Sequence, residues 1–267
     1  MEIRVERREE GAQKAEGHTV MIDVFRAFTL QAYAFHQGCE KIILVQSAEQ
    51  AFDLKRSHPE YILTGERDGV KIPGFDLGNS PSAVARMDLK GKTLVHTTTN
   101  GVNGIRYARH ADQIVTGAFV NAKATAEYLK RCHPDVVSLV AMGWRNRDTE
   151  EDLLCAEYFR SLLLGYEMDS LSDRLQQLRY QEGRKFFNPD TQDIFPAGTS
   201  SASASHTPDT PWASYPPASH PFFRSMTRRT GKMRFGLPNG AKQAILKGRK
   251  GGCYHVRSCT SLREKTL

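Results

Sequence analysis

The sequence predicts an α/β fold with three layers, in which a mostly parallel sheet is covered by helices on both faces. Two observations predict it. Short runs of Val, Ile and Leu alternate with helical patterns at least five times between residues 20 and 165. These runs are apolar on both strand faces, as strands buried inside a parallel sheet are. A chain of 267 residues can hold one large domain or two small ones. A division into two similar subdomains near residue 110 is therefore a second possibility.

The first part of the chain predicts three strands and two helices. Each strand is a run of aliphatic residues, and the helix boundaries carry suitable end signals. Gly38 closes the first helix, and Ser47 caps the second. The expected elements are a strand over 20–23, a helix over 27–37, a strand over 41–46, a helix over 48–56 and a strand over 61–67.

The second part continues the alternation after a loop rich in Gly and Pro over residues 68–81. Asn121 is expected to cap the third of its helices. The expected elements are a short helix over 82–87, a strand over 93–96, a helix over 102–109, a strand over 113–120, a helix over 122–132, a strand over 136–142 and a helix over 153–165.

The chain changes character near residue 196. Residues 197–220 are almost all Ala, Ser, Thr, Pro and His, and residues 224–267 are basic with little apolar periodicity. We expect no strand or helix from this region to join the core. The predicted domain therefore covers residues 1–196, and residues 197–267 form a basic, Ser- and Pro-rich tail that is either disordered or translated out of frame.

Charge and cysteine content exclude several classes of protein. Residues 197–267 hold 12 Lys and Arg against two acidic residues, a net charge of +10, whereas residues 1–196 carry −3. The basic pI thus belongs to the tail, and we expect no nucleic-acid partner for the folded part. The five cysteines form no CxxC pair, and no apolar run or signal-peptide core indicates a membrane. The composition is typical of a cytoplasmic protein. It leaves open whether the protein forms a homo-oligomer.

Polar side chains follow several of the predicted strands at the point where each ends. Ligands of open parallel sheets bind outside the carboxyl ends of the strands. The polar groups at those ends are Asp23 with Arg26, Glu66 with Arg67, the run from Thr97 to Gly101, and the run from Arg145 to Asp152; the loop with Asp76, Asn79 and Ser80 leaves the same edge. Because they come from separate strands, we expect a site at this edge.

The carboxylates among these groups allow more than one role. Asp23 could be a helix cap, a magnesium ligand or a nucleophile. Magnesium prefers one or two protein carboxylates with substrate oxygens and waters, and Asp23, Glu66, Glu151 and Asp152 are available for that. Glu151 and Asp152 could equally stabilise a helix N-terminus.

The cations and polar turns suit an anionic ligand. Arg26, Arg67 and Arg145 carry guanidinium groups that match the paired oxygens of phosphate or sulfonate. The run from Thr97 to Gly101 places hydroxyls and unpaired N–H groups where a strand passes into a helix, which suits an anion or a ligand-free helix cap. Asn79 and Ser80 could form an anion-binding nest or a simple turn. The substrate expected from these groups is a small anionic phospho-acid.

Several familiar catalytic motifs are absent. The sequence has no GxxxxGK[ST] loop, no GxGxxG after the first strand and no GxSxG elbow. Asp23 is followed by Val24 and Phe25, so the DxD pair of haloacid-dehalogenase-type phosphatases is missing as well. Metal-assisted attack by water is one hydrolytic route that stays open.

Four segments together resemble the 2-phosphosulfolactate phosphatase family. They are IDVFRAFT, TGERDGVKIPGFDLGNSP, TTTNG and EDLLCAEYF, and they occur in the family's order within residues 18–195. The resemblance implies an α/β fold and a magnesium-dependent phosphatase. The implied reaction hydrolyses (R)-2-phospho-3-sulfolactate to 3-sulfolactate and phosphate, a step in making coenzyme M.

The family motifs fall on particular residues of this chain, to which we assign roles. The expected catalytic residues are Asp23, Arg26, Glu66 and Arg67. The expected Mg²⁺ ligands are Asp23, Glu66, Glu151 and Asp152. The expected substrate-binding residues are Asp76, Asn79, Ser80, Thr97, Thr98, Thr99, Asn100 and Gly101, to which Arg145 is added for its chemistry.

Residues 197–267 depart from the family, because they do not resemble its Asp- and Phe-containing closing segment. This departure keeps other functions open. The chain could be a phosphatase-like protein that is inactive or acts on another small phospho-acid. It could also be a non-catalytic binding protein with a basic tail.

Overall fold

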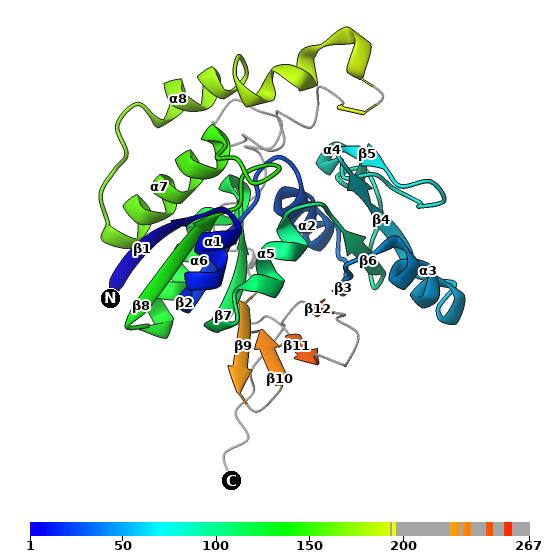
Figure 1. Ribbon diagram of the computed structural model, residues 1–267, viewed down its shortest axis with the longest axis horizontal. Helices are drawn as coiled ribbons and strands as arrows, with labels where there is room; N and C mark the ends of the chain where they lie inside the picture. The colour runs from blue at the N-terminus through cyan, green and yellow to red at the C-terminus, as the bar shows by residue number, and fades with distance from the viewer. Residues whose placement is uncertain (193, 196–224, 230–231, 236–243, 248–253, 258–267) are drawn as a thin grey trace.

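The computed structural model describes residues 1–192 and 194–195, and four short strands over 225–229, 232–235, 244–247 and 254–257. The strands form two sheets, which lie on either side of a group of helices (Figure 1). We call the larger sheet A and the smaller sheet B.

Four parallel strands form one side of sheet A, from its edge inward. They are β1 (Glu2–Arg7), β8 (Val136–Ala141), β2 (Glu16–Ile22) and β7 (His110–Gly117), in that spatial order. β9 (Ser225–Arg229) pairs antiparallel with β7 and is followed by β10 (Lys232–Phe235) and β11 (Ala244–Lys247).

Sheet B is built mostly from strands that lie between β2 and β7 in the sequence. Its order is β12 (Tyr254–Arg257), β3 (Lys41–Leu44), β6 (Thr93–Thr97), β4 (Ile62–Arg67) and β5 (Val70–Lys71). The strands β3, β6 and β4 are parallel. Since β2 and β7 are hydrogen-bonded neighbours, strands from both sides of residue 110 share sheet A.

Alternating residues of each strand bury against different helices, as the two-residue period of a strand requires. Val20 and Ile22 of β2 pack toward α6 (Ala122–Cys132) and α7 (Glu150–Leu164). Met21 packs on the opposite face, in a core with α1 (Arg8–Lys14), α2 (Ala27–His36) and α5 (Gly101–Tyr107) that also includes residues of sheet B. α3 (Ala48–Ser57) covers the outer face of sheet B. The predicted α/β fold with helices on both faces of a parallel sheet is confirmed, and the central helix layer serves two sheets.

Several predicted boundaries need correction. β1 and α1 lie in what the sequence indicated was a polar lead-in, because β1 is an edge strand with no fully buried residue. The Ser47 cap is confirmed, since its Oγ accepts the Gln50 N–H at 3.3 Å. Asn121 instead accepts the Ala118 N–H at 2.9 Å, and so it caps the preceding turn η1 (Phe119–Asn121).

The expectation that no strand from residues 197–267 would join the core is wrong for β9 and β12, whose backbones pair with β7 and β3. The basic, polar composition of this region hid these pairings, because backbone hydrogen bonds do not depend on side-chain type. Whether the region is read in frame stays a prediction for the gene sequence, and residues 197–224 lie outside the described residues.

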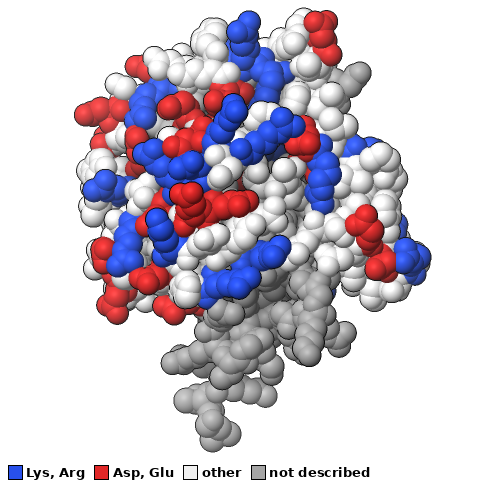
Figure 2. All heavy atoms as spheres, viewed as in Figure 1, with Lys and Arg blue, Asp and Glu red and all other residues white. Residues whose placement is uncertain are grey.

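Four described helices remain. α4 (Pro81–Val84) lies in the loop after β5, and α8 (Leu171–Leu178), η2 (Glu182–Phe187) and η3 (Pro189–Thr191) follow α7. In the described part of the chain no helix combines the length and apolarity needed to cross a membrane. Acidic and basic side chains are interspersed on the face seen in Figure 2, so this face has no extended field of one sign.

Candidate active site

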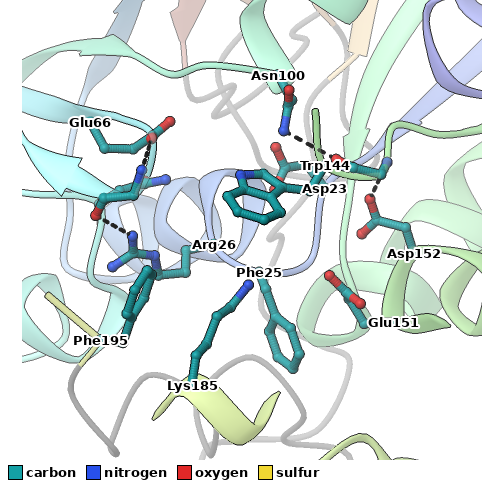
Figure 3. A pocket seen from close by; sticks show the side chains of 13 residues that line it. Asp23, Phe25, Arg26, Glu66, Asn100, Trp144, Glu151, Asp152, Lys185 and Phe195 are labelled. Carbon is teal, nitrogen blue, oxygen red and sulfur yellow. Dashed lines mark hydrogen bonds between the residues drawn. The ribbon is translucent and has the colours of Figure 1, made fainter. Parts of the chain in front are cut away.

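The carboxyl ends of four parallel strands, two from each sheet, meet around one pocket (Figure 3). β2 and β8 contribute from sheet A, and β4 and β6 contribute from sheet B. The segment after α8 closes the remaining side. The lining residues are Asp23, Phe25, Arg26, Glu66, Gly69, Asn79, Asn100, Gly143, Trp144, Glu151, Asp152, Lys185 and Phe195. The strand ends that carry Asp23, Glu66 and Asn100 therefore do meet, and the site roles expected for their residues stay predictions.

Asp23 follows the last residue of β2 and is buried. Its Oδ1 accepts the Ala27 N–H at 3.2 Å, which also caps the start of α2. Its Oδ2 accepts no hydrogen bond from the described residues and lies beside Gly101, where a Cβ would come within 3.1 Å of it. Burial raises the pKa of Asp23 to about 6, against the lowering effect of the Ala27 hydrogen bond, and the charge of Glu66 adds to the increase.

Glu66 uses both carboxylate oxygens to fix the backbone around the pocket. Oε1 accepts the Thr99 N–H at 2.7 Å. Oε2 accepts the Thr99 hydroxyl at 3.0 Å and the Gly69 N–H at 2.6 Å. Gly69 has a φ of +89°, and a Cβ there would be 2.8 Å from the Phe195 ring, so the position requires glycine. Glu66 therefore ties the ends of β4 and β6 together.

Asp152 plays the equivalent part in sheet A. Its Oδ1 accepts the Val24 N–H at 2.8 Å, and its Oδ2 accepts the Gly143 N–H at 2.9 Å. The two bonds join the segments that follow β2 and β8. Burial raises the pKa of Asp152 well above its ordinary value, and the charges of Glu151 and Asp23 raise it further.

Glu151, in the first turn of α7, is buried and incompletely satisfied. Its Oε2 has no hydrogen-bond partner in the described part of the chain. Burial raises the pKa of Glu151 to about 7, although the positive charge of Lys185 lowers it. A buried carboxylate oxygen without a partner is costly, so this atom is a candidate for contact with a ligand or cation.

Arg26 provides a buried positive charge whose donors are largely committed. Nη1 donates to the Ile194 carbonyl at 2.8 Å, and Nη2 donates to the Gly69 carbonyl at 2.7 Å. The guanidinium also lies 4.9 Å from the centre of the Phe195 ring. Burial lowers the pKa of Arg26, while the charges of Glu66 and Asp23 oppose the shift. Arg26 thus holds two flanking segments together and contributes charge to the pocket.

Lys185 is a lining residue that sequence reasoning missed. It comes from η2, and its Nζ lies 5.3 Å from the Trp144 ring centre and 5.7 Å from that of Phe195. Its charge lowers the pKa values of both Asp23 and Glu151, which places it electrostatically between them.

Asn79 is held in the pocket wall by a buried chain of side chains. Its Oδ1 lies 3.2 Å from Nε2 of His96, and Nδ1 of that ring lies 3.2 Å from Nε2 of Gln31. Burial lowers the pKa of His96 to about 3, so the ring is neutral near pH 7. With the Gln31 amide donating to Nδ1, the ring donates from Nε2 to Asn79, whose amide nitrogen then remains for other contacts.

The other residues that the sequence nominated divide into two groups. Asn100 lines the pocket and donates from Nδ2 to the Gly143 carbonyl at 3.2 Å. Arg67 does not line it, because Nη2 donates to the Gln46 carbonyl at 3.0 Å and to Thr97 Oγ1 at 2.9 Å. Thr97 is buried beside β4, and so both residues support the strand ends from behind.

Four further nominated residues lie outside the lining. Arg145 is exposed and pairs with Asp68 at 2.9 Å. Asp76 is exposed and accepts the Leu63 N–H at 2.7 Å. Ser80 contacts the Ser82 hydroxyl at 2.9 Å. Thr98 accepts the Val102 N–H at 3.4 Å, which is the helix-cap alternative for this turn.

The carboxylates of the pocket can supply only some of the ligands of a magnesium ion. Among the described residues, no three His, Cys, Asp or Glu side chains converge as a ready-made metal site. Asp23 and Glu151 nevertheless each keep one oxygen without a hydrogen-bond donor among the described residues, and burial raises the pKa values of both. Two carboxylates with substrate oxygens and waters are the ligand set that Mg²⁺ commonly takes, so these residues fit the ion.

Comparison with known proteins agrees with this geometry. A family model described as 2-phosphosulpholactate phosphatase matches residues 4–186. A relative named "Probable 2-phosphosulfolactate phosphatase" from Bacillus subtilis (strain 168) is 37% identical over 172 residues, which cover 63% of this chain and 74% of the relative.

Two further relatives carry the same name. The protein from Caldicellulosiruptor saccharolyticus is 38% identical over 177 residues, 65% of this chain and 73% of its own length. The protein from Carboxydothermus hydrogenoformans is 43% identical over 155 residues, 58% of this chain and 64% of its own length. The matched family region contains every strand end that forms the pocket. The chain therefore belongs to the 2-phosphosulfolactate phosphatase family.

Proposed function

We propose that this protein hydrolyses (R)-2-phospho-3-sulfolactate to 3-sulfolactate and phosphate, the type of reaction used in making coenzyme M. The observation that carries the proposal is the pairing of Asp23 and Glu151, each with an open carboxylate oxygen, with Arg26 and Lys185 in one pocket. The names of the relatives supply the substrate, and the pocket supplies groups of matching charge.

Asp23 and Glu151 are the residues that we assign to Mg²⁺. When bound, the ion would neutralise charge on the phosphate and activate a water molecule for attack at phosphorus. A dication between them would also remove the electrostatic cost that raises both pKa values. For Glu66 and Asp152 we propose a supporting role in place of the Mg²⁺ ligation expected from the sequence, because each uses both oxygens to hold backbone N–H groups.

The cations orient the anionic substrate within the pocket. Arg26 is fixed by two backbone carbonyls, so its charge is preorganised before substrate enters. Asn79 and Asn100 present amide groups at the wall, each held by one hydrogen bond to a neighbour. Such fixed dipoles and charges lower the barrier because they need no reorganisation during the reaction.

Aromatic side chains limit the access of water to these charges. Phe25, Trp144 and Phe195 line the pocket, and Phe25 packs edge-on against Phe186 at a centroid distance of 5.2 Å. Electrostatic interactions strengthen as the local dielectric falls. This apolar wall therefore increases the effect of Asp23, Arg26 and the other polar groups on a bound phosphate ester.

Phosphate release by the purified full chain tests the proposal. The substrates are 2-phospho-3-sulfolactate, 2-phospholactate and O-phosphoserine, each with Mg²⁺ and with a chelator. We expect release that requires Mg²⁺ and is fastest with the sulfonate substrate. A faster reaction with another phospho-acid would replace the substrate assignment, and no release from any of them by a cooperatively folding protein would sink the phosphatase proposal.

A further inference from the structure

The proposed substrate carries a sulfonate and a carboxylate besides its phosphate, so the pocket needs cations for them, and most nearby candidates are already committed. Arg67 donates to a carbonyl and a hydroxyl behind the strand ends, and Arg145 pairs with Asp68 on the surface. Both terminal nitrogens of Arg26 donate to backbone carbonyls. Lys185, in contrast, makes no hydrogen bond or ion pair with any residue in the described part of the chain.

Lys185 is held by aromatic rings instead of by carboxylates. Its Nζ lies 5.3 Å from the ring centre of Trp144, 5.5 Å from that of Phe186 and 5.7 Å from that of Phe195. These contacts stabilise an ammonium group without using its three N–H donors. Figure 3 shows the side chain reaching into the pocket beside Phe25.

The surroundings of Lys185 favour an anion of single, dispersed charge. The cost of taking an ion out of water rises with the square of its charge, so a phosphate dianion loses more than a sulfonate on an aromatic wall. A sulfonate spreads one charge over three oxygens, which can accept the three N–H donors of Lys185. The phosphate end is better served by Asp23 and Glu151, which could share a cation with it.

We infer that Lys185 is the specificity-determining residue that binds the sulfonate of the substrate, while the phosphate lies toward Asp23 and Glu151. The inference rests on the proposed function and assigns the two ends of the substrate to different lining residues of the one pocket. It also gives the segment Glu182–Phe187 a role in substrate choice, although it lies far in sequence from the strand ends.

Two measurements on the full chain test it, with three variants. Lys185→Met removes the charge and keeps an apolar side chain, and Lys185→Arg keeps the charge. Arg184→Met is the matched control, because Arg184 precedes Lys185 in the same segment but is exposed and outside the pocket lining. The first measurement is kcat/KM with 2-phospho-3-sulfolactate and with 2-phospholactate, which lacks the sulfonate. The second is calorimetric binding of 3-sulfolactate and of malate, which carries a carboxylate in place of the sulfonate.

We expect Lys185→Met to lower the preference for the sulfonate substrate over 2-phospholactate by about 100-fold, mainly through KM, the usual size of a charge-assisted contact. Lys185→Arg should recover part of this preference, and Arg184→Met should retain it. The wild type should bind 3-sulfolactate more tightly than malate, and Lys185→Met should remove that difference. An equal loss on both phospho-acids, or an undiminished preference, would overturn the inference.

The binding measurement separates this inference from the proposed function. If the wild type released no phosphate but lost 3-sulfolactate binding on Lys185→Met, the phosphatase proposal would fail and the sulfonate site would stand. If 3-sulfolactate bound equally well to wild type and Lys185→Met, or did not bind to the wild type, the sulfonate site would be wrong.

Discussion

Replacing Asp23 by asparagine is expected to make the metal-free protein more stable while it abolishes phosphate release. Burial raises the pKa of Asp23 from its ordinary 3.8 to about 6. A shift of this size corresponds to at most about 3 kcal/mol of destabilisation at pH 8, where the carboxylate is ionised in both the folded and the unfolded chain. Asparagine removes the charge and keeps an oxygen that can accept the Ala27 N–H.

The sign of the pH dependence follows from the raised pKa. Between about pH 4 and pH 6 the folded chain binds more protons at Asp23 than the unfolded chain does, so the wild type gains stability as the pH falls through that window. The advantage of Asp23→Asn should therefore shrink from at most about 3 kcal/mol at pH 8 to about 0.5 kcal/mol at pH 4.

Urea unfolding with a chelator, followed at several pH values, measures this difference directly. Saturating Mg²⁺ should then stabilise the wild type, by about 2.7 kcal/mol at one hundred times its dissociation constant, and have little effect on the variant. A metal-free Asp23→Asn protein that is less stable than wild type at pH 8 would refute the reasoning. So would an advantage that grows as the pH falls.

Three further predictions concern residues that support the pocket. Glu66→Gln should lower the free energy of unfolding by about 1–3 kcal/mol, because a side-chain amide cannot accept hydrogen bonds from both Thr99 and Gly69. A variant at least as stable as the wild type in urea would contradict this prediction. His96 has a pKa lowered by burial to about 3, so its contribution to stability is present above pH 6.5 and falls by about 2 kcal/mol between pH 7 and pH 5; parallel pH profiles for wild type and His96→Gln would oppose this. Gly101→Ala should reduce the Mg²⁺ affinity measured by calorimetry, because the added Cβ would come within 3.1 Å of Asp23 Oδ2. An unchanged affinity would count against the assignment of Mg²⁺ to Asp23.

The sequence predicted the alternation of strands and helices well, because strands buried on both faces and helix end signals are local patterns. It did not predict two sheets, because the residue pattern of a strand that is apolar on both faces does not indicate which sheet the strand joins. One signal was available. All residues of α2 from Ala27 to Ala34 are buried, and a helix that is apolar on all sides is typical of a position between two layers.

The candidate site was predictable where its residues follow strands and not elsewhere. Asp23 and Glu66 line the pocket because parallel strands bring their carboxyl ends together. Arg67 and Arg145 have the chemistry of anion binders, but their partners are set by tertiary contacts that no local pattern reveals. Lys185 could not be predicted in this way, because it reaches the pocket from η2, which directly follows none of the strands that form the pocket.

Phosphate release from 2-phospho-3-sulfolactate by a matched pair of variants tests the central claim most directly. Asp23→Asn changes a carboxylate inside the pocket, and Asp53→Asn makes the same change on α3, where Asp53 is exposed and paired with Arg56. With Mg²⁺ present, the account predicts a loss of at least about 100-fold in kcat/KM for Asp23→Asn and less than about threefold for Asp53→Asn. Full activity of a folded Asp23→Asn protein would contradict the claim that this pocket performs the hydrolysis.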